Sequence, residues 1–488
     1  MCRLRCRLAS PALVGTAIAC LPVAAIAGQA MADDGGTSAS STIAAAPYAP
    51  WRAPVLTTER YNEDWSALAD PAKRTGRWTE PFKYLPLDGS GKVYLTTGVE
   101  LRVRYEGYRG NGWGAAAAPD DGYVWKRVLP YADLHAGAVR VFVQPILAYA
   151  SGVKPAPGPV DRTGADLLQG FADALFRLDG DTTLRLRAGR ELLGFGSERL
   201  VGTRYGPNVL LAFDGGRAIL HHGALTANVF YVRPVEAGPH AFDDKSSSTR
   251  ALWGVYGTWT LRHGGIDAYY LGYRNDRASF EQGSGRERRG TLGSRVFGAA
   301  DGWHWNVEGM LQDGRFDGMP IRAWSLATEL GRGFASLPLA PDVTVRADIA
   351  SGDRSPGDHR LGTFNALFPK GKYFGELSPI GPYNIVNLQP GITFALRPQL
   401  RLGVAGTLYW RQSRGDGVYD MPGHLLRRGS ARDARFIGWE TELSLEWQAT
   451  RELSLSGSVS SFRPGAFIRQ TGPARRIRML GLEANFRF

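Results

Sequence analysis

The last residues of the chain, RMLGLEANFRF (478–488), alternate between apolar and polar side chains. The even-numbered positions from Leu480 to Phe488 are apolar, whereas the odd-numbered positions are polar, charged or glycine. A period of two is the pleat of a β-strand, which offers one face to apolar surroundings and the other to water. The stretch therefore predicts a C-terminal strand that faces either a protein core or a lipid bilayer.

The N-terminus helps to choose between these two surroundings. The first ten residues contain three arginines and no acid, residues 11–27 are apolar, and small residues surround Ala32. This order predicts a secretory signal peptide over residues 1–32, cleaved after Ala32 or alternatively after Ala27. A membrane anchor is disfavoured because Pro22 interrupts the apolar run.

Composition narrows the class of the exported chain. The three cysteines, Cys2, Cys6 and Cys20, all lie in the signal, so the mature chain has no disulfide, thiolate metal site or cysteine nucleophile. The mean hydropathy is −0.22, and no apolar run beyond the signal is long enough for a membrane helix. The 62 glycines, 19 tyrosines, 13 tryptophans and 21 phenylalanines suit a large β-barrel with aromatic girdles.

Alternating strands recur along the chain. In Val99–Glu106, apolar or aromatic residues alternate with charged residues, and similar runs occupy 140–147, 184–188, 342–349, 441–447 and 451–459. Short turn signals separate some of these runs, whereas the polar stretches 238–249, 281–289 and 415–433 predict longer loops. Short turns at one rim and long loops at the other are typical of an outer-membrane barrel.

We therefore predict an all-β fold, a transmembrane antiparallel β-barrel of about 16–18 strands over residues 92–488. A barrel of this size encloses an aqueous lumen. Residues 33–91 are predicted to be a partly disordered periplasmic segment, called the lead-in below, because they begin rich in Gly, Ser, Ala and Pro.

Several stretches resemble the bacterial alginate export family of outer-membrane porins. They are 59–65, 83–87, 98–106, 189–192, 196–200, 213–215, 351–353, 362–365, 367–369 and the closing Phe-Arg-Phe. The resemblance implies an 18-stranded barrel whose arginine-lined lumen passes an anionic uronate polymer outward, with loops that gate the pore.

Arginine dominates the basic residues, since only eight of the 58 are lysine and the formal net charge is +12. Guanidinium groups pair with carboxylates through two parallel hydrogen bonds, and rings of basic residues select anions in pores. Strand parity assigns the first five of the predicted pore residues, and the resemblance assigns the other three. They are Arg102, Arg104, Arg140, Arg185 and Arg187, followed by Arg190, Arg199 and Arg217. Glu100, Glu191 and Asp214 are the expected counter-charges, and the alternative is that each arginine only braces the barrel.

The predicted function is a passive, anion-selective porin in the outer membrane, without enzymatic activity, cofactor or metal. Its expected cargo is an alginate-like anionic polysaccharide, and the alternative is uptake of small organic anions such as sugar acids. A barrel hydrolase or surface receptor is disfavoured because the eight histidines are scattered and the lead-in is too short for a receptor plug domain. Asp353 and Asp358 lack the carboxylate density of a calcium loop.

The expected partners follow from this location. They are outer-membrane lipid, the barrel assembly machinery and periplasmic export proteins, and the protein is expected to be a monomer. Phe488, with Phe486 on the same face, is expected to be the C-terminal signal that the assembly machinery reads. Nucleic acid is excluded because the basic residues are spread over alternate strand faces rather than gathered into one patch.

Overall fold

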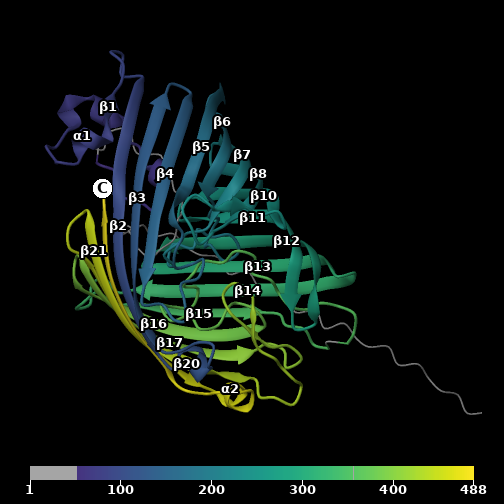
Figure 1. The fold of residues 1–488 in the computed structure, drawn as a ribbon. Coiled ribbons are helices and arrows are strands. Elements are labelled where there is room, and N and C mark those ends of the chain that lie inside the picture. The colour runs from purple at the N-terminus through teal and green to yellow at the C-terminus, as the bar shows by residue number, and fades with distance from the viewer. Residues whose placement is uncertain (1–51, 356) are drawn as a thin grey trace, which may run out of the picture.

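Alternation of side chains continues through eighteen long strands, which form one closed antiparallel barrel (Figure 1). The computed structural model describes residues 52–355 and 357–488. The predicted signal peptide and the first part of the lead-in lie outside these residues. No helix in the described ranges is long and apolar enough to cross a membrane.

The barrel strands are β2 (Val93–Arg109), β3 (Asp121–Ala136), β4 (Val139–Ser151), β5 (Gly164–Asp179), β6 (Thr182–Leu192), β7 (Ala212–His222), β8 (Leu225–Glu236), β10 (Arg250–Leu261), β11 (Gly264–Phe280), β12 (Gly283–Ala300), β13 (Trp303–Phe316), β14 (Met319–Gly333), β15 (Asp342–Ala350), β16 (Ile385–Arg397), β17 (Leu400–Arg411), β20 (Phe436–Gln448), β21 (Leu453–Pro464) and β22 (Ile477–Arg487). The shorter elements are the 3-10 helices η1 (Arg60–Asn62), η2 (Ser66–Ala69), η3 (Pro71–Lys73) and η4 (Asn111–Gly114), the helices α1 (Glu80–Lys83) and α2 (Ala466–Gln470), and the strands β1 (Leu85–Pro86), β9 (Lys245–Ser246), β18 (Val418–Tyr419) and β19 (Leu425–Arg427).

The C-terminal strand closes the barrel, as its alternation predicts. β22 pairs antiparallel with β21 on one side and with β2 on the other, and Leu101 lies opposite Phe486. The amide of Phe488 donates to the carbonyl of Val99 over 3.1 Å, and the amide of Val99 donates back over 3.2 Å. Closure matters because it leaves no strand edge unpaired inside a membrane.

Loop length differs between the two rims. Residues 137–138, 180–181, 223–224 and 301–302 form short turns at the rim where β22 ends. Residues 193–211, 351–384 and 412–435 form longer connections at the opposite rim. This asymmetry confirms the barrel type inferred from the sequence.

One predicted loop is wrong. Residues 281–289 are polar throughout, yet β12 begins at Gly283 and includes most of them. The reason is that Glu287 and Arg289 point inward and form an ion pair of 2.6 Å in which both side chains are fully buried. A run of charges is therefore compatible with a strand when the lumen pairs them.

The outward face is an apolar band. Val103, Leu292 and Leu311 expose 51%, 60% and 63% of their surface, although each lies in the middle of a strand. Trp259 and Trp303 lie beside the short-turn rim and are also exposed. An apolar band edged by aromatic residues matches the hydrocarbon layer of a bilayer and its interface.

Candidate functional site: the lumen of the barrel

Strand β2 places its charged residues in the lumen. Glu100, Arg102 and Arg104 are buried, whereas the intervening Leu101 and Val103 are exposed on the outer wall. The inward direction of Arg102 and Arg104 follows from the two-residue pleat. Parity also turns Arg140, Arg185 and Arg187 inward, because Val139, Val141 and Leu186 are exposed on the outer wall.

Arg102 holds a loop that crosses the lumen. Its guanidinium donates to the backbone carbonyls of Tyr205 and Gly206 over 2.8 Å and 2.6 Å. Tyr205 also donates its hydroxyl to Glu100 over 2.9 Å. Residues 193–211, the crossing loop, are thus fixed to the wall at β2.

Arg199 fixes the crossing loop on the far side. Its Nε lies 3.5 Å from Glu308 on β13, and its Nη1 lies 4.0 Å from Asp348 on β15. Since the loop leaves the wall between β6 and β7, these contacts carry it across the barrel interior. The crossing loop therefore narrows the lumen.

A second loop folds inward and meets the crossing loop; its residues 357–384 are called the inner loop below. Val201 and Phe368 form a parallel β-bridge, and Phe368 packs against Phe213 of the wall with ring centroids 5.2 Å apart. Phe374 and Tyr383 of the inner loop are also almost fully buried. Side chains of both loops thus form an apolar core inside the barrel, at the side where the long loops enter.

Arg104 anchors the inner loop through carboxylates. It lies 2.5 Å from Glu106, 2.8 Å from Glu483 and 2.5 Å from Glu376 of the inner loop. Burial opposes the charge on Glu376, but Lys372 and Arg104 hold the pKa of this carboxyl at about 2. The anchor is therefore charged at every physiological pH.

The remaining inward arginines on the predicted list pair with wall carboxylates. Arg140 donates to Asp133, and Arg187 donates to Asp173 and Glu191 over 2.7 Å and 3.0 Å. Arg185 shares Asp173, and Arg217 lies 3.4 Å from Glu191. The predicted counter-charges Glu100 and Glu191 thus lie beside basic groups, as a mixed lumen requires.

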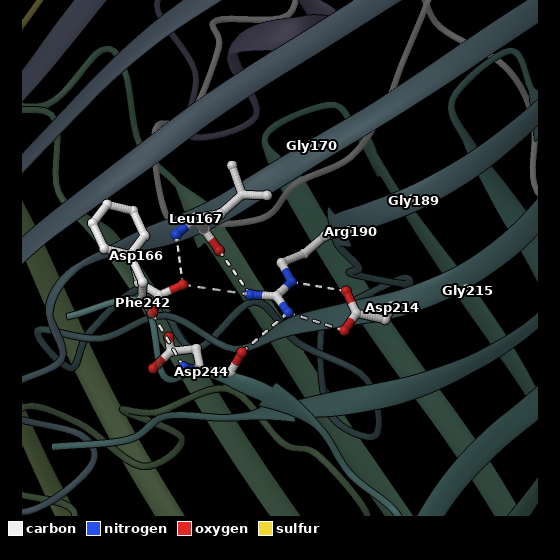
Figure 2. Close-up of a pocket in the computed structure, with 9 residues that line it drawn as sticks. All are labelled: Asp166, Leu167, Gly170, Gly189, Arg190, Asp214, Gly215, Phe242 and Asp244. Carbon is white, nitrogen blue, oxygen red and sulfur yellow. Dashed lines mark hydrogen bonds and ion pairs between the residues drawn. The ribbon is translucent and has the colours of Figure 1, made fainter. Parts of the chain in front are cut away.

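Arg190 and Asp214 lie elsewhere. β6 pairs with β7 in continuous register from Thr182 to Leu192. Arg190 therefore lies on the outward face of the sheet with Leu186, and Arg187 lies on the inward face. Figure 2 shows its guanidinium between the carboxylates of Asp214 and Asp166, and the Asp214 contact is 2.8 Å. This pair is outside the lumen wall, at the long-loop end of the strands.

Sequence reasoning missed several lumen cations. Arg127 on β3 donates to Glu100 over 2.7 Å and to the carbonyl of Pro207 over 3.1 Å, but the adjacent Lys126 obscures the strand parity. Arg204 of the crossing loop and Lys370 of the inner loop have no side-chain hydrogen bond or ion pair with any residue of the described ranges. Burial lowers the pKa of Lys370 to about 8. No strand pattern could reveal these two, because they lie in irregular loops.

Comparison with known proteins agrees with this architecture. A family model described as "Alginate export" matches residues 93–481. No curated protein sequence matches the chain. Solved structures that share the fold include OccK8 (OprE) of Pseudomonas aeruginosa, with a TM-score of 0.55 and 12% identity over 81% of this chain and 98% of that one.

Two further solved structures have the same fold. OccK2 (OpdF) of Pseudomonas aeruginosa, in complex with glucuronate, has a TM-score of 0.53 and 11% identity over 81% of this chain and 96% of that one. OccAB3 of Acinetobacter baumannii has a TM-score of 0.53 and 11% identity over 80% and 99% of the two chains. These neighbours are outer-membrane porins, and at this identity they show the fold alone.

Proposed function

Because the chain belongs to the alginate export family of outer-membrane β-barrels, we propose that its lumen is an anion-selective passage for a polysaccharide that contains uronate residues. The family and the fold are those of transport channels, and we propose that the protein catalyses no reaction. Transport is then passive, and the lumen lowers the electrostatic barrier for a carboxylate.

The unpaired cations Arg204 and Lys370 carry this proposal. The inward wall arginines on the predicted list are already paired with carboxylates, so they add little net positive charge to the path. Arg204 and Lys370 belong to the two loops that narrow the lumen, and neither has an acidic partner in hydrogen-bond range among the residues that the structure describes. An anion that passes the constriction meets these two charges, which have not been neutralised.

The paired arginines have a second role in this scheme. A wall of unpaired guanidinium groups would hold a polyanion too tightly to release it. A pair with an accessible arginine, such as Arg185 with Asp173, can exchange partners with a passing carboxylate at a modest energetic cost, because Arg185 is 31% exposed and solvent screens the pair. Uronate rings would then move between neighbouring pairs rather than rest at one site.

Uptake of small sugar acids is the second candidate. It is favoured by the narrowing of the lumen by the crossing and inner loops, and a structural neighbour, OccK2, was solved in complex with glucuronate. Both candidate functions use the same cations. They differ in the length of the sugar chain that passes through the lumen.

Flux into proteoliposomes tests the proposal. We expect uronate oligomers to enter faster than neutral oligosaccharides of equal length, and we expect Arg204→Gln with Lys370→Gln to remove most of the difference. Arg428→Gln, an exposed arginine in the long-loop region, is the matched control for a lost charge. Equal rates for charged and neutral sugars in the unmodified protein would contradict anion selectivity, and exclusion of oligomers with passage of monomers would favour uptake.

A further inference from the structure

The described part of the lead-in is folded against the barrel. Residues 60–73 form η1, η2 and η3, and α1 follows at Glu80–Lys83. In Figure 1 this segment lies at the end of the barrel where β1 begins, beside β2. Trp65, Leu68 and Tyr84 form a buried apolar cluster there, and Leu68 has no exposed surface. The described part of the lead-in is thus packed against the barrel rather than extended away from it.

Tyr61 enters the lumen. Its ring packs edge-on against Phe142 of β4 and Phe171 of β5, with centroids 5.6 Å and 5.2 Å apart. Its hydroxyl donates to the carbonyl of Leu192 at the far end of β6 over 3.3 Å. Since Phe142 and Phe171 are inward residues, Tyr61 lies inside the barrel.

The predicted pore arginines hold Tyr61. Arg140 donates to its backbone carbonyl over 2.5 Å, and the guanidinium carbon of Arg187 lies 4.5 Å from the ring centroid. Cation–π contacts of this kind strengthen when they are removed from water. Two arginines that the sequence assigns to the pore are therefore covered by a segment of the same chain.

Charged residues beside Tyr61 are buried with partners on the wall. Arg60 pairs with Glu63 at 3.1 Å and lies over the ring of Tyr131 on β3. Lys83 donates to the Tyr131 hydroxyl and to the carbonyl of Thr97 on β2, each over 2.8 Å. These contacts join the lead-in to a continuous arc of wall from β2 to β6.

The first described residues of the lead-in contact the barrel seam, where β22 pairs with β21 and β2. Arg451, in the turn before β21, donates to the carbonyl of Pro54 over 2.5 Å, and Arg487 of β22 donates to the carbonyl of Leu56 over 3.4 Å. Glu59 is buried and lies among charges of β6, β7 and the crossing loop, namely Arg187, Glu191, Arg217 and Glu198. The lead-in therefore reaches from the seam to the crossing loop.

We propose that residues 57–69, called the plug below, close the short-turn half of the lumen, and that the aromatic and basic groups under Tyr61 form a binding site for a ring of an anionic sugar once the plug leaves. Once the plug leaves, the faces of Phe142 and Phe171 that now pack on Tyr61 can stack on a sugar ring, and Tyr131 packs beside Phe142 in the same aromatic cluster. Arg140 and Arg187 lie at the edge of the same aromatic cluster, where they can pair with a ring carboxylate.

The plug is small enough to leave without unfolding the barrel. It contributes no strand to the barrel sheet, and its 3-10 helices make their hydrogen bonds internally, to wall side chains or, through the Tyr61 hydroxyl, to the carbonyl of Leu192. Removal of the plug from the lumen would expose the apolar surface of Tyr61, Trp65 and Leu68 to water. Burial of this surface stabilises the bound plug. The closed state is then the resting state of the channel, and a sugar acid competes with Tyr61 for one site.

Single-channel conductance of the full chain tests the plug. We expect Tyr61→Ala to raise the conductance by about twofold or more, because the open cross-section sets the current. Phe82→Ala is the matched control, since Phe82 is an exposed aromatic residue of the same lead-in that contacts Phe488 at the outer edge of the rim. Equal conductance of the Tyr61→Ala variant and the unmodified protein would overturn the plug.

A cross-link separates opening from misfolding. Cys2, Cys6 and Cys20 are the only cysteines and are replaced by serine, after which Tyr61→Cys and Phe171→Cys are joined by a short thiol cross-linker. We expect the joined protein to conduct poorly and the unjoined double variant to conduct well. High conductance after complete joining would also overturn the plug.

The sugar half of the proposal rests on the proposed anionic substrate and has its own readout. In the Tyr61→Ala background, we expect a uronate trisaccharide to block the current at a concentration several-fold lower than in the same background with Phe171→Leu. If Tyr61→Ala opens the channel but Phe171→Leu leaves the block unchanged, the plug stands and the sugar site is refuted. Failure of uronates to block either protein would instead count against the proposed substrate.

Discussion

Replacement of Arg104 by methionine should destabilise the barrel more than any other single change at a predicted pore arginine. Arg104 lies within 2.8 Å of Glu106, Glu483 and Glu376, and it exposes only 7% of its side chain. Removal of one partner of a buried ion pair costs about 3–5 kcal/mol, because the other charges remain buried without compensation. Lys372 also contacts Glu376 and offsets part of this loss, so we expect the lower end of the range.

The matched control is Arg185→Met. Arg185 makes one contact of 3.2 Å with Asp173 and is 31% exposed, so solvent screens the pair and its loss should cost at most about 1 kcal/mol. The assay is reversible urea unfolding in phospholipid bilayers, followed by tryptophan fluorescence. Free energies of unfolding for the two variants that agree within 1 kcal/mol would refute the view that Arg104 is a buried anchor for the inner loop.

Three further outcomes are expected. Burial raises the pKa of Glu59 from 4.5 to about 7 against the opposing effect of Arg217, so the bound plug favours the protonated acid. The protonated Glu59 side chain therefore contributes fully to plug binding below pH 4.5, and this contribution is lost as the pH rises to about 7. Conductance should be lower at pH 5 than at pH 7, and Glu59→Gln should flatten this dependence on pH. Phe488→Glu should reduce the heat-modifiable barrel in outer-membrane fractions, since Phe488 pairs with Val99 and contacts Trp78 and Phe82 at the seam; unchanged amounts would count against its role in assembly. Leu311→Arg, at an outward position that is 63% exposed, should cost about 2–4 kcal/mol of folding free energy in bilayers, and a cost near zero would show that this position does not face hydrocarbon.

The barrel could be predicted because its periodicity is local. Val99–Glu106 alternates without a break, and its outward and inward residues are those that parity assigns. The same rule fails at residues 281–289, where turn-forming and charged residues resemble a loop until Glu287 and Arg289 are seen to pair inside. Pairing across strands is a property of the closed barrel and is not visible in one stretch of sequence.

The site was harder to predict than the wall. Strand parity turns Arg185 and Arg187 inward, and continued through the strand it turns Arg190 outward, whereas the family resemblance assigned Arg190 to the pore. Arg204, Lys370 and Tyr61 lie in irregular segments, where no period relates a residue to a face. Their positions depend on contacts such as Tyr61 with Phe171, which join residues far apart in the chain.

The central claim is that the lumen selects anions, and the reversal potential of the protein in a planar bilayer tests it most directly. With a potassium chloride gradient across the bilayer, the account predicts a reversal potential displaced toward the equilibrium potential of chloride, and a smaller displacement for Arg204→Gln with Lys370→Gln. A reversal potential displaced toward that of potassium would contradict it.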